Sequence, residues 1–185
     1  MTRRSVAAPR ADAPSKETPV TVADIMTREF EVVHEDATLL EAMGHLRDCP
    51  LVEDEIGIKC VVVLDSGDSL AGVLTQSDVV GEILFPYFVR DLADRTAGQR
   101  RIRTEDYRAL AAWAAKVRVR DVMTRGPVTL APGDDLFEAA DRIVSRKVKS
   151  LPVIEGGKVV GIVYRSSLYR HIAGSILESG PRSPS

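Results

Sequence analysis

Apolar residues recur at helical spacing in two segments of the chain, and the second segment repeats the first 97 positions later. The apolar positions are Leu39, Ala42, Met43 and Leu46 in the first segment and Leu136, Ala139, Ala140, Ile143 and Val144 in the second. Each segment opens on a capping residue with glutamate three positions on, Thr38 with Glu41 and Asp135 with Glu138. The spacing predicts two helices, each with one face built for burial.

Each predicted helix is followed by two β-rich runs around a turn that contains glycine. The runs are 61–64 and 70–74 in the first copy, and 151–154 and 159–163 in the second. Such pairs of runs predict hairpins, and each hairpin leads into a second helix. A short apolar strand before the first helix completes a unit of strand, helix, strand, strand and helix. Segment 22–28 also returns at 119–125, so the chain is a tandem repeat whose function is expected between the copies.

The motifs of these copies resemble a pair of cystathionine-β-synthase (CBS) domains, the Bateman module. The resemblance rests on the Met-Thr pair in the recurring segments 22–28 and 119–125, which we call the entry segments, and on Leu151-Pro152-Val153. Above all it rests on the Gly-Val-Leu-Thr-Gln-Ser-Asp run from Gly72 to Asp78. It implies an α/β fold of two βαββα-type repeats packed about a pseudo-two-fold axis, with a helical insertion between them. The expected segments are a disordered tail 1–18, repeat 1 at 19–84, the insertion 85–115, repeat 2 at 116–175 and a disordered tail 176–185.

The resemblance also implies a function. CBS pairs are regulatory modules, not enzymes, and commonly bind adenosine-containing ligands in clefts between the repeats. We therefore expect AMP, ADP or ATP, with S-adenosylmethionine less favoured, and a signal carried by a change of shape or association. The alternative is a scaffold module that binds no ligand, dimerises through its repeats and insertion, and contacts a partner protein.

The first motif supplies groups suited to a nucleotide. Thr75 ends a strand and Ser77 and Asp78 open a helix, where free N–H groups and the helix dipole favour a phosphate. The Asp78 carboxylate can accept from both hydroxyls of a ribose, and the hydroxyls of Thr75 and Ser77 can donate to phosphate oxygens. The alternative is that Ser77 and Asp78 merely cap the helix.

Aligning the chain with the family adds four residues from other segments. In CBS pairs each cleft joins one repeat's motif to the entry segment of the other. This implies that Thr124, Val128 and Val148 surround the base and ribose, and that Lys59 meets phosphate through charge-assisted hydrogen bonds. An ordinary solvated lysine is the alternative for Lys59.

The second motif departs from the family pattern. Tyr164 stands where the motif has threonine, and Ser167 stands where it has the ribose-binding aspartate. Serine lacks the two oxygens of a carboxylate, and a phenol ring would intrude where a small hydroxyl leaves room. The sequence therefore predicts a weak or closed second cleft, unless Tyr164 points elsewhere and the site is only altered.

The connection between the repeats, about 81–117, is longer than is usual in the family and is predicted to form two helices. It concentrates aromatic residues in a chain that is only 5% aromatic: Phe85, Tyr87, Phe88, Tyr107 and Trp113. Thr104 is predicted to cap the second helix. These aromatics either pack on their own module or contribute to a homodimer interface.

Composition excludes other classes of function. A net charge of −2 gives no case for nucleic acid or an anionic membrane, and no segment reaches the length of a membrane span. A secretory leader is not evident, so we expect a cytoplasmic protein. Cys49 and Cys60 do not have metal-ligand spacing, and the three histidines form no catalytic arrangement. We expect neither a metal site nor an enzyme.

Overall fold

The computed structural model describes residues 3–5, 19–48, 60–84 and 104–179. The chain divides into two compact units, and each unit combines parts of both repeats. Unit 1 consists of Met1–Arg4 and Phe30–Pro127, and unit 2 of Ser5–Glu29 and Val128–Ser185. Each unit therefore holds the hairpin of one repeat together with the Met-Thr entry segment of the other.

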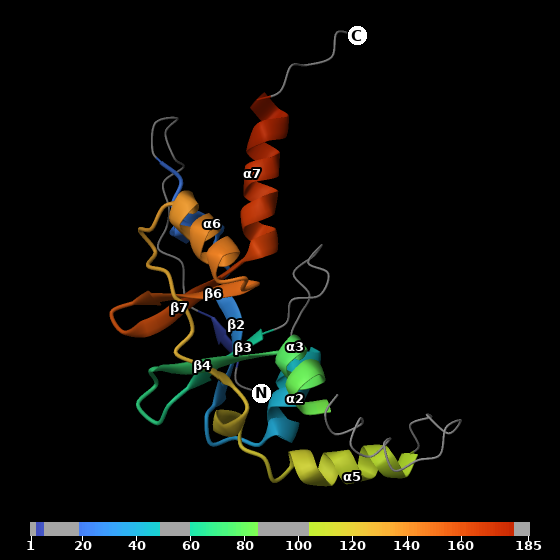
Figure 1. Ribbon diagram of the computed structural model, residues 1–185. Coiled ribbons are helices and arrows are strands. Elements are labelled where there is room, and N and C mark those ends of the chain that lie inside the picture. Colours follow the sequence, from blue (N-terminus) through green and yellow to red (C-terminus); the bar gives the residue numbers. More distant parts are fainter. Residues whose placement is uncertain (1–2, 6–18, 49–59, 85–103, 180–185) are drawn as a thin grey trace, which may run out of the picture. The chain divides into compact units, whose positions relative to one another are not determined.

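Unit 1 is built on a five-stranded sheet in which the strand order follows the chain. Its strands are β1 (Arg3–Ser5), β2 (Glu29–His34), β3 (Cys60–Leu64), β4 (Leu70–Thr75) and β5 (Thr124–Arg125). Figure 1 labels the strands β2, β3 and β4. Strands β2 and β3 are parallel, whereas β3–β4 and β4–β5 are antiparallel. The predicted hairpin is confirmed. Strand β1 lies in the segment predicted as a disordered tail, and residues 6–18 lie outside the described residues.

Among the helices of unit 1, α2 (Leu39–Asp48) begins directly after its predicted capping residue Thr38. The other helices described in this unit are α3 (Gln76–Asp78), the π-helical η1 (Val79–Leu84), α5 (Thr104–Ala114) and the 3-10 turn η2 (Val119–Asp121). The Glu41 amide donates to Thr38 Oγ1 at 3.2 Å, which is the predicted cap of α2. The chain just before η2 runs along the start of α2, because the Leu39 amide donates to the carbonyl of Val117 at 2.8 Å.

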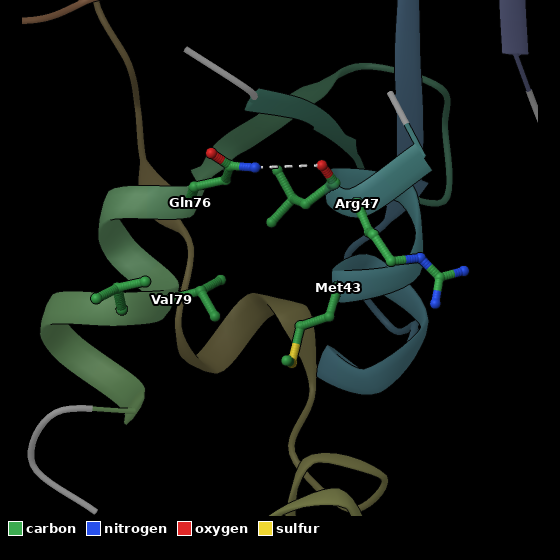
Figure 2. A pocket seen from close by; sticks show the side chains of 6 residues that line it. Met43, Arg47, Gln76 and Val79 are labelled. Atoms are coloured by element: carbon green, nitrogen blue, oxygen red, sulfur yellow. Dashed lines mark hydrogen bonds between the residues drawn. The ribbon is translucent and has the colours of Figure 1, made fainter. Parts of the chain in front are cut away.

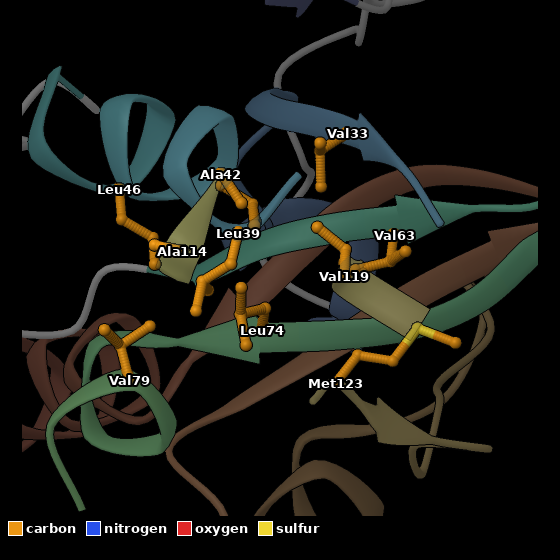
Figure 3. Close-up of a cluster of buried hydrophobic side chains, with 11 residues drawn as sticks. Val33, Leu39, Ala42, Leu46, Val63, Leu74, Val79, Ala114, Val119 and Met123 are labelled. Atoms are coloured by element: carbon orange, nitrogen blue, oxygen red, sulfur yellow. The ribbon is translucent and has the colours of Figure 1, made fainter. Parts of the chain in front are cut away.

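A cluster of buried side chains packs in unit 1 (Figure 3). It contains Val33, Leu39, Ala42, Leu46, Val61, Val63, Leu74, Val79, Ala114, Val119 and Met123. The last three come from α5 and the second entry segment, so the first hairpin is covered by residues that follow it by about 40 positions. Trp113 also packs against this cluster. This aromatic of the insertion therefore packs on its own unit, while the run from Phe85 to Phe88 lies outside the described residues.

Unit 2 packs its helices on a two-stranded antiparallel sheet (Figure 1). Its elements are α1 (Val22–Ile25), α6 (Leu136–Ser145), β6 (Ser150–Glu155), β7 (Lys158–Tyr164) and α7 (Arg165–Ser179). Asp135 caps α6 as predicted, since its Oδ1 accepts from the Glu138 amide at 2.8 Å. The core joins Val22 of the first entry segment to buried residues of the second repeat: Leu130, Ala139, Ile143, Leu151, Val153, Val163 and Leu168.

Two features of unit 2 differ from the sequence expectation. The strand predicted at the start of the second repeat is reduced to one parallel bridge between Leu130 and Val153. Pro127 and Pro132 flank this bridge, and proline offers no N–H to extend a ladder. Helix α7 ends at Ser179, so residues 176–179 continue the helix instead of beginning a disordered tail.

Candidate functional site

Thr75 and Asp78 hold each other in a closed hydrogen-bonded arrangement at the end of β4. The Thr75 amide and Oγ1 both donate to Asp78 Oδ2 at 2.8 Å, and the Asp78 amide donates to Thr75 Oγ1 at 3.2 Å. These two residues are a capping box. The sequence offered Ser77 and Asp78 as N-cap residues, but Thr75 is the N-cap, and Asp78 is the third helical residue, whose carboxylate is held in place by the box. Within the described residues, Asp78 Oδ1 makes no hydrogen bond.

The helix that starts at this motif is irregular. It has three α-helical residues in α3 and then passes into the π-helix η1. π-Helical turns are rare and are frequent at functional sites. Ser77 lies in the first turn with an exposed side chain. The motif therefore presents one exposed hydroxyl and one fixed carboxylate from a short, irregular helix start.

The second entry segment lies directly beside the motif strand. Strand β5 pairs with β4, with Thr124 opposite Val73 and Arg125 opposite Gly72. A Cβ at Gly72 would lie 2.6 Å from the Thr124 carbonyl oxygen and 2.8 Å from Met123 Sδ. Only glycine allows this approach without displacing the Met-Thr backbone.

Unit 2 uses the same arrangement with the roles of the repeats exchanged. The Thr27 amide donates to the carbonyl of Ile162 at 2.9 Å. A Cβ at Gly161 would lie 2.7 Å from Met26 Sδ and 2.8 Å from the Thr27 carbonyl oxygen. The recurring Met-Thr and glycine of the two copies are therefore packing partners of each other.

The structure brings only some of the predicted site residues into one unit. Thr75, Ser77, Asp78 and Thr124 all belong to unit 1. Val128 and Val148 belong to unit 2, where both are partly buried and pack against its core. Lys59 lies outside the described residues.

The second motif differs in burial as well as in residue type. Tyr164 is the last residue of β7, pairs with Ser150, and is only 5% exposed. Its counterpart Thr75 is partly exposed. The Tyr164 side chain is thus buried, and α7 starts at the next residue. Ser166 Oγ is buried and has no hydrogen-bond partner among the described residues.

Unit 1 also contains a pocket that the sequence did not predict (Figure 2). Its volume is about 270 Å³, and it is lined by Met43, Leu46 and Arg47 of α2, Gln76 of α3, and Val79 and Val80 of η1. Gln76 Nε2 donates to the Leu46 carbonyl at 3.5 Å and links the motif helix to α2. The helical period marked Met43 and Leu46 for burial. It gave no signal that η1 would leave a hollow beside them.

Comparison with known proteins identifies the family. The family model described as "CBS domain" matches residues 22–84 and 119–174. These two matches cover more than half of the chain, so the chain belongs to the CBS-domain family and carries two copies of the domain in tandem. The predicted α/β fold of a CBS pair is confirmed.

Several proteins match most of this chain over most of their own length. An uncharacterised protein of Methanocaldococcus jannaschii, MJ1426, is 29% identical over 159 residues, which are 80% of this chain and 88% of the relative. The CBS domain of a CBS-domain-containing membrane protein from Sphaerobacter thermophilus has 30% identity and a TM-score of 0.61, covering 82% of this chain and 87% of that chain. CBSX2 from Arabidopsis thaliana has 25% identity and a TM-score of 0.61, covering 88% and 100%. A structure of CBSX2 in complex with AMP matches with 23% identity and a TM-score of 0.57, covering 84% and 97%.

None of the helices in the described ranges is both long enough and apolar enough to cross a bilayer.

Proposed function

We propose that this protein is a regulatory module that binds one adenine nucleotide per chain through the first motif. The observation that carries the proposal is the geometry of Asp78. Its Oδ2 is fixed by the amide and hydroxyl of Thr75, while Oδ1 makes no hydrogen bond to the described residues. A carboxylate held in this way is pre-organised to accept from the two hydroxyls of a ribose.

Other groups of the same motif support a phosphate-bearing ligand. The exposed hydroxyl of Ser77 can donate to a phosphate oxygen, and Lys59 would add a positive charge. Thr124 lies on the strand paired with the motif strand and would contact the nucleoside. Val128 and Val148, the remaining residues predicted for the site, belong to unit 2, and their part in binding stays a prediction.

The second motif is proposed not to bind a nucleotide. Ser167 offers one hydroxyl in place of a carboxylate, and the buried ring of Tyr164 occupies protein interior. Binding of one nucleotide per chain follows. AMP, ADP and ATP are the favoured ligands and S-adenosylmethionine is less favoured. CBSX2, a relative with the same fold, has been crystallised with AMP.

The ligand class can be tested by thermal unfolding of the purified protein with millimolar AMP, ADP, ATP or S-adenosylmethionine. A ligand that binds only the folded state stabilises it by mass action, about 2.7 kcal/mol at a concentration of 100 Kd. We expect at least one nucleotide to raise the Tm by several degrees, and Asp78→Ala to abolish the shift. If none of the four ligands moves the Tm, the module acts as a scaffold without a nucleotide.

The proposed output is a change of shape or association in a cytoplasmic homodimer, without catalysis. Association is supported by large apolar side chains that unit 2 exposes on α6 and α7: Phe137, Ile172, Ile176 and Leu177. Two-fold dimers are the commonest oligomers. Light scattering coupled to gel filtration, with and without nucleotide, tests this output. A monomer at tens of micromolar under both conditions would refute the dimer.

A further inference from the structure

The two repeats have diverged in charge at one corner of the hairpin. The registers of the hairpins establish which residues correspond, because Cys60 pairs with Thr75 in unit 1 and Ser150 pairs with Tyr164 in unit 2. Arg146, Lys147, Lys149 and Arg165 of the second repeat then align with Ile56, Gly57, Lys59 and Gln76 of the first. Ser167 aligns with Asp78. At these five positions the formal charge is +4 in the second repeat and 0 in the first.

The four cations lie on two segments that a backbone hydrogen bond joins, and they are here called the basic patch. Arg146, Lys147 and Lys149 follow α6 directly, and the Arg165 amide donates to the Lys149 carbonyl at 2.9 Å. All four residues are exposed. The sequence contains no acidic residue from Arg142 to Ile154 or from Gly156 to Leu177. Both stretches therefore contain only positively charged residues among their charged side chains.

Lys147 occupies a backbone conformation that disfavours lysine. Its φ is 54°, in the left-handed region, where it follows the last turn of α6. The amide of Val148 donates to the carbonyl of Ile143 at 3.2 Å. This hydrogen bond is typical of helix C-termini in which the left-handed residue, here Lys147, is usually glycine. The first repeat has Gly57 at the aligned position. A side chain has thus been accepted here against the local backbone preference, which points to a use for its charge.

Large apolar side chains flank the basic patch. Val144 is 74% exposed and lies two residues before Arg146, and Tyr169 is 73% exposed and lies one helical turn after Arg165. Protein interfaces combine exposed aromatic anchors with a charged rim, whereas nucleic-acid interfaces depend chiefly on phosphate contacts. The buried Tyr164 and the loss of the motif aspartate disfavour a nucleoside ligand at this corner.

We propose that the basic patch docks an acidic segment of a partner protein, with Asp and Glu side chains on the cations and apolar side chains against Val144 and Tyr169. The second repeat has exchanged the residues of a nucleotide site for those of a partner surface. The first motif senses the ligand, and the second repeat contacts the protein that responds.

The test uses the full chain and a fluorescein-labelled peptide of Glu and Asp with interspersed leucines. The patch variant carries Arg146→Gln, Lys147→Gly and Arg165→Gln. The control variant carries Arg108→Gln, Lys116→Gln and Lys158→Gln, which removes the same charge from exposed cations elsewhere. We expect the patch variant to weaken peptide binding at least tenfold and the control variant less than about twofold. Tyr169→Ser, or serine in place of the peptide leucines, should weaken binding about threefold.

Lys147→Gly alone separates docking from folding. Removing a left-handed lysine should raise the Tm by about 2 °C while peptide binding weakens.

The proposal is overturned if the peptide does not bind, if both triple variants lose affinity equally, or if a single-stranded oligonucleotide or phosphatidylserine vesicles bind more tightly than the peptide. Light scattering on each variant checks that its oligomeric state is unchanged, and a loss of affinity that tracks a changed oligomeric state also overturns the proposal. The patch variant should bind nucleotide as the wild type does. A failure of peptide docking can therefore be told apart from a failure of the proposed nucleotide site.

Discussion

The helix starts at Gln76 in unit 1 and at Arg165 in unit 2 follow hairpins of the same register but lead to different chemistry. In unit 1 a threonine and an aspartate close a capping box and the helix turns π-helical after three residues. In unit 2 a buried tyrosine precedes a regular helix of 15 residues. Both units contain the same hairpin and helix start, whereas the pair of threonine and aspartate occurs at this place in unit 1 alone. Both units also share the close packing of a glycine, Gly72 or Gly161, against a Met-Thr segment.

Gly72→Ala and Gly161→Ala test the glycine packing that both units share, and they should have the largest effect on stability. Each new Cβ would lie under 3 Å from the backbone oxygen of the crossing Met-Thr segment, so each variant should lose about 2–4 kcal/mol of unfolding free energy. Urea denaturation measures the loss. Gly44→Ala in α2 is the control, since nothing lies within 4 Å of its Cβ position, and it should gain about 0.5–1 kcal/mol. A Gly161→Ala protein as stable as wild type would break the equivalence of the two units.

The binding difference is tested by Asp78→Ala and Ser167→Ala. Loss of the Asp78 carboxylate should cost about 2–4 kcal/mol of nucleotide binding, or roughly 30- to 1,000-fold in Kd. Ser167→Ala should change Kd by less than about threefold. Titration calorimetry should give one site per chain for the wild type. Two sites, or equal losses from the two substitutions, would show that Tyr164 and Ser167 do not disable the second motif.

A buried polar pair distinguishes the cores of the units. In unit 1 His45 Nδ1 lies 3.0 Å from Glu31 Oε2 with both side chains largely buried. The aligned residues of the second repeat are Val128 and Arg142. Glu31→Ala leaves the imidazole without its partner and should destabilise by about 1–3 kcal/mol, and Glu31→Gln by less. Val128→Ala should cost about 1 kcal/mol through lost apolar contact. If Glu31→Ala leaves the denaturation midpoint unmoved, the pair does not support unit 1.

The smallest paired effect is expected at the helix caps. Thr38 and Asp135 accept from the third amide of α2 and α6, so Thr38→Ala and Asp135→Ala should each cost about 1 kcal/mol. Thr38→Ser and Asp135→Asn retain an acceptor and should recover most of this loss. Equal stability of the alanine and capping variants at either position would show that its hydrogen bond contributes nothing.

The elements specified by neighbouring residues could be predicted from the sequence. Both hairpins, the caps at Thr38 and Asp135, and the burial of Leu39 and Ile143 follow from local spacing and turn chemistry. The motif from Gly72 to Asp78 could also be recognised in the sequence as that of a CBS domain. The strand predicted before α6 was wrong because two prolines flank a single bridge residue, and the sequence contained that signal.

The tertiary structure decided which distant groups meet. Trp113 could pack on its own unit or on a second copy, and only the folded unit shows it against the core of unit 1. The pairing of Thr27 with Ile162 and of Thr124 with Val73 joins residues that share no local pattern. The sequence left open whether Asp78 takes part in capping, and its hydrogen bonds to Thr75 show that it closes the capping box of α3. Residues close together in the sequence determine the local hydrogen bonds and the apolar spacing of helices and strands. The partner of a strand edge depends instead on a surface that forms only when the chain folds.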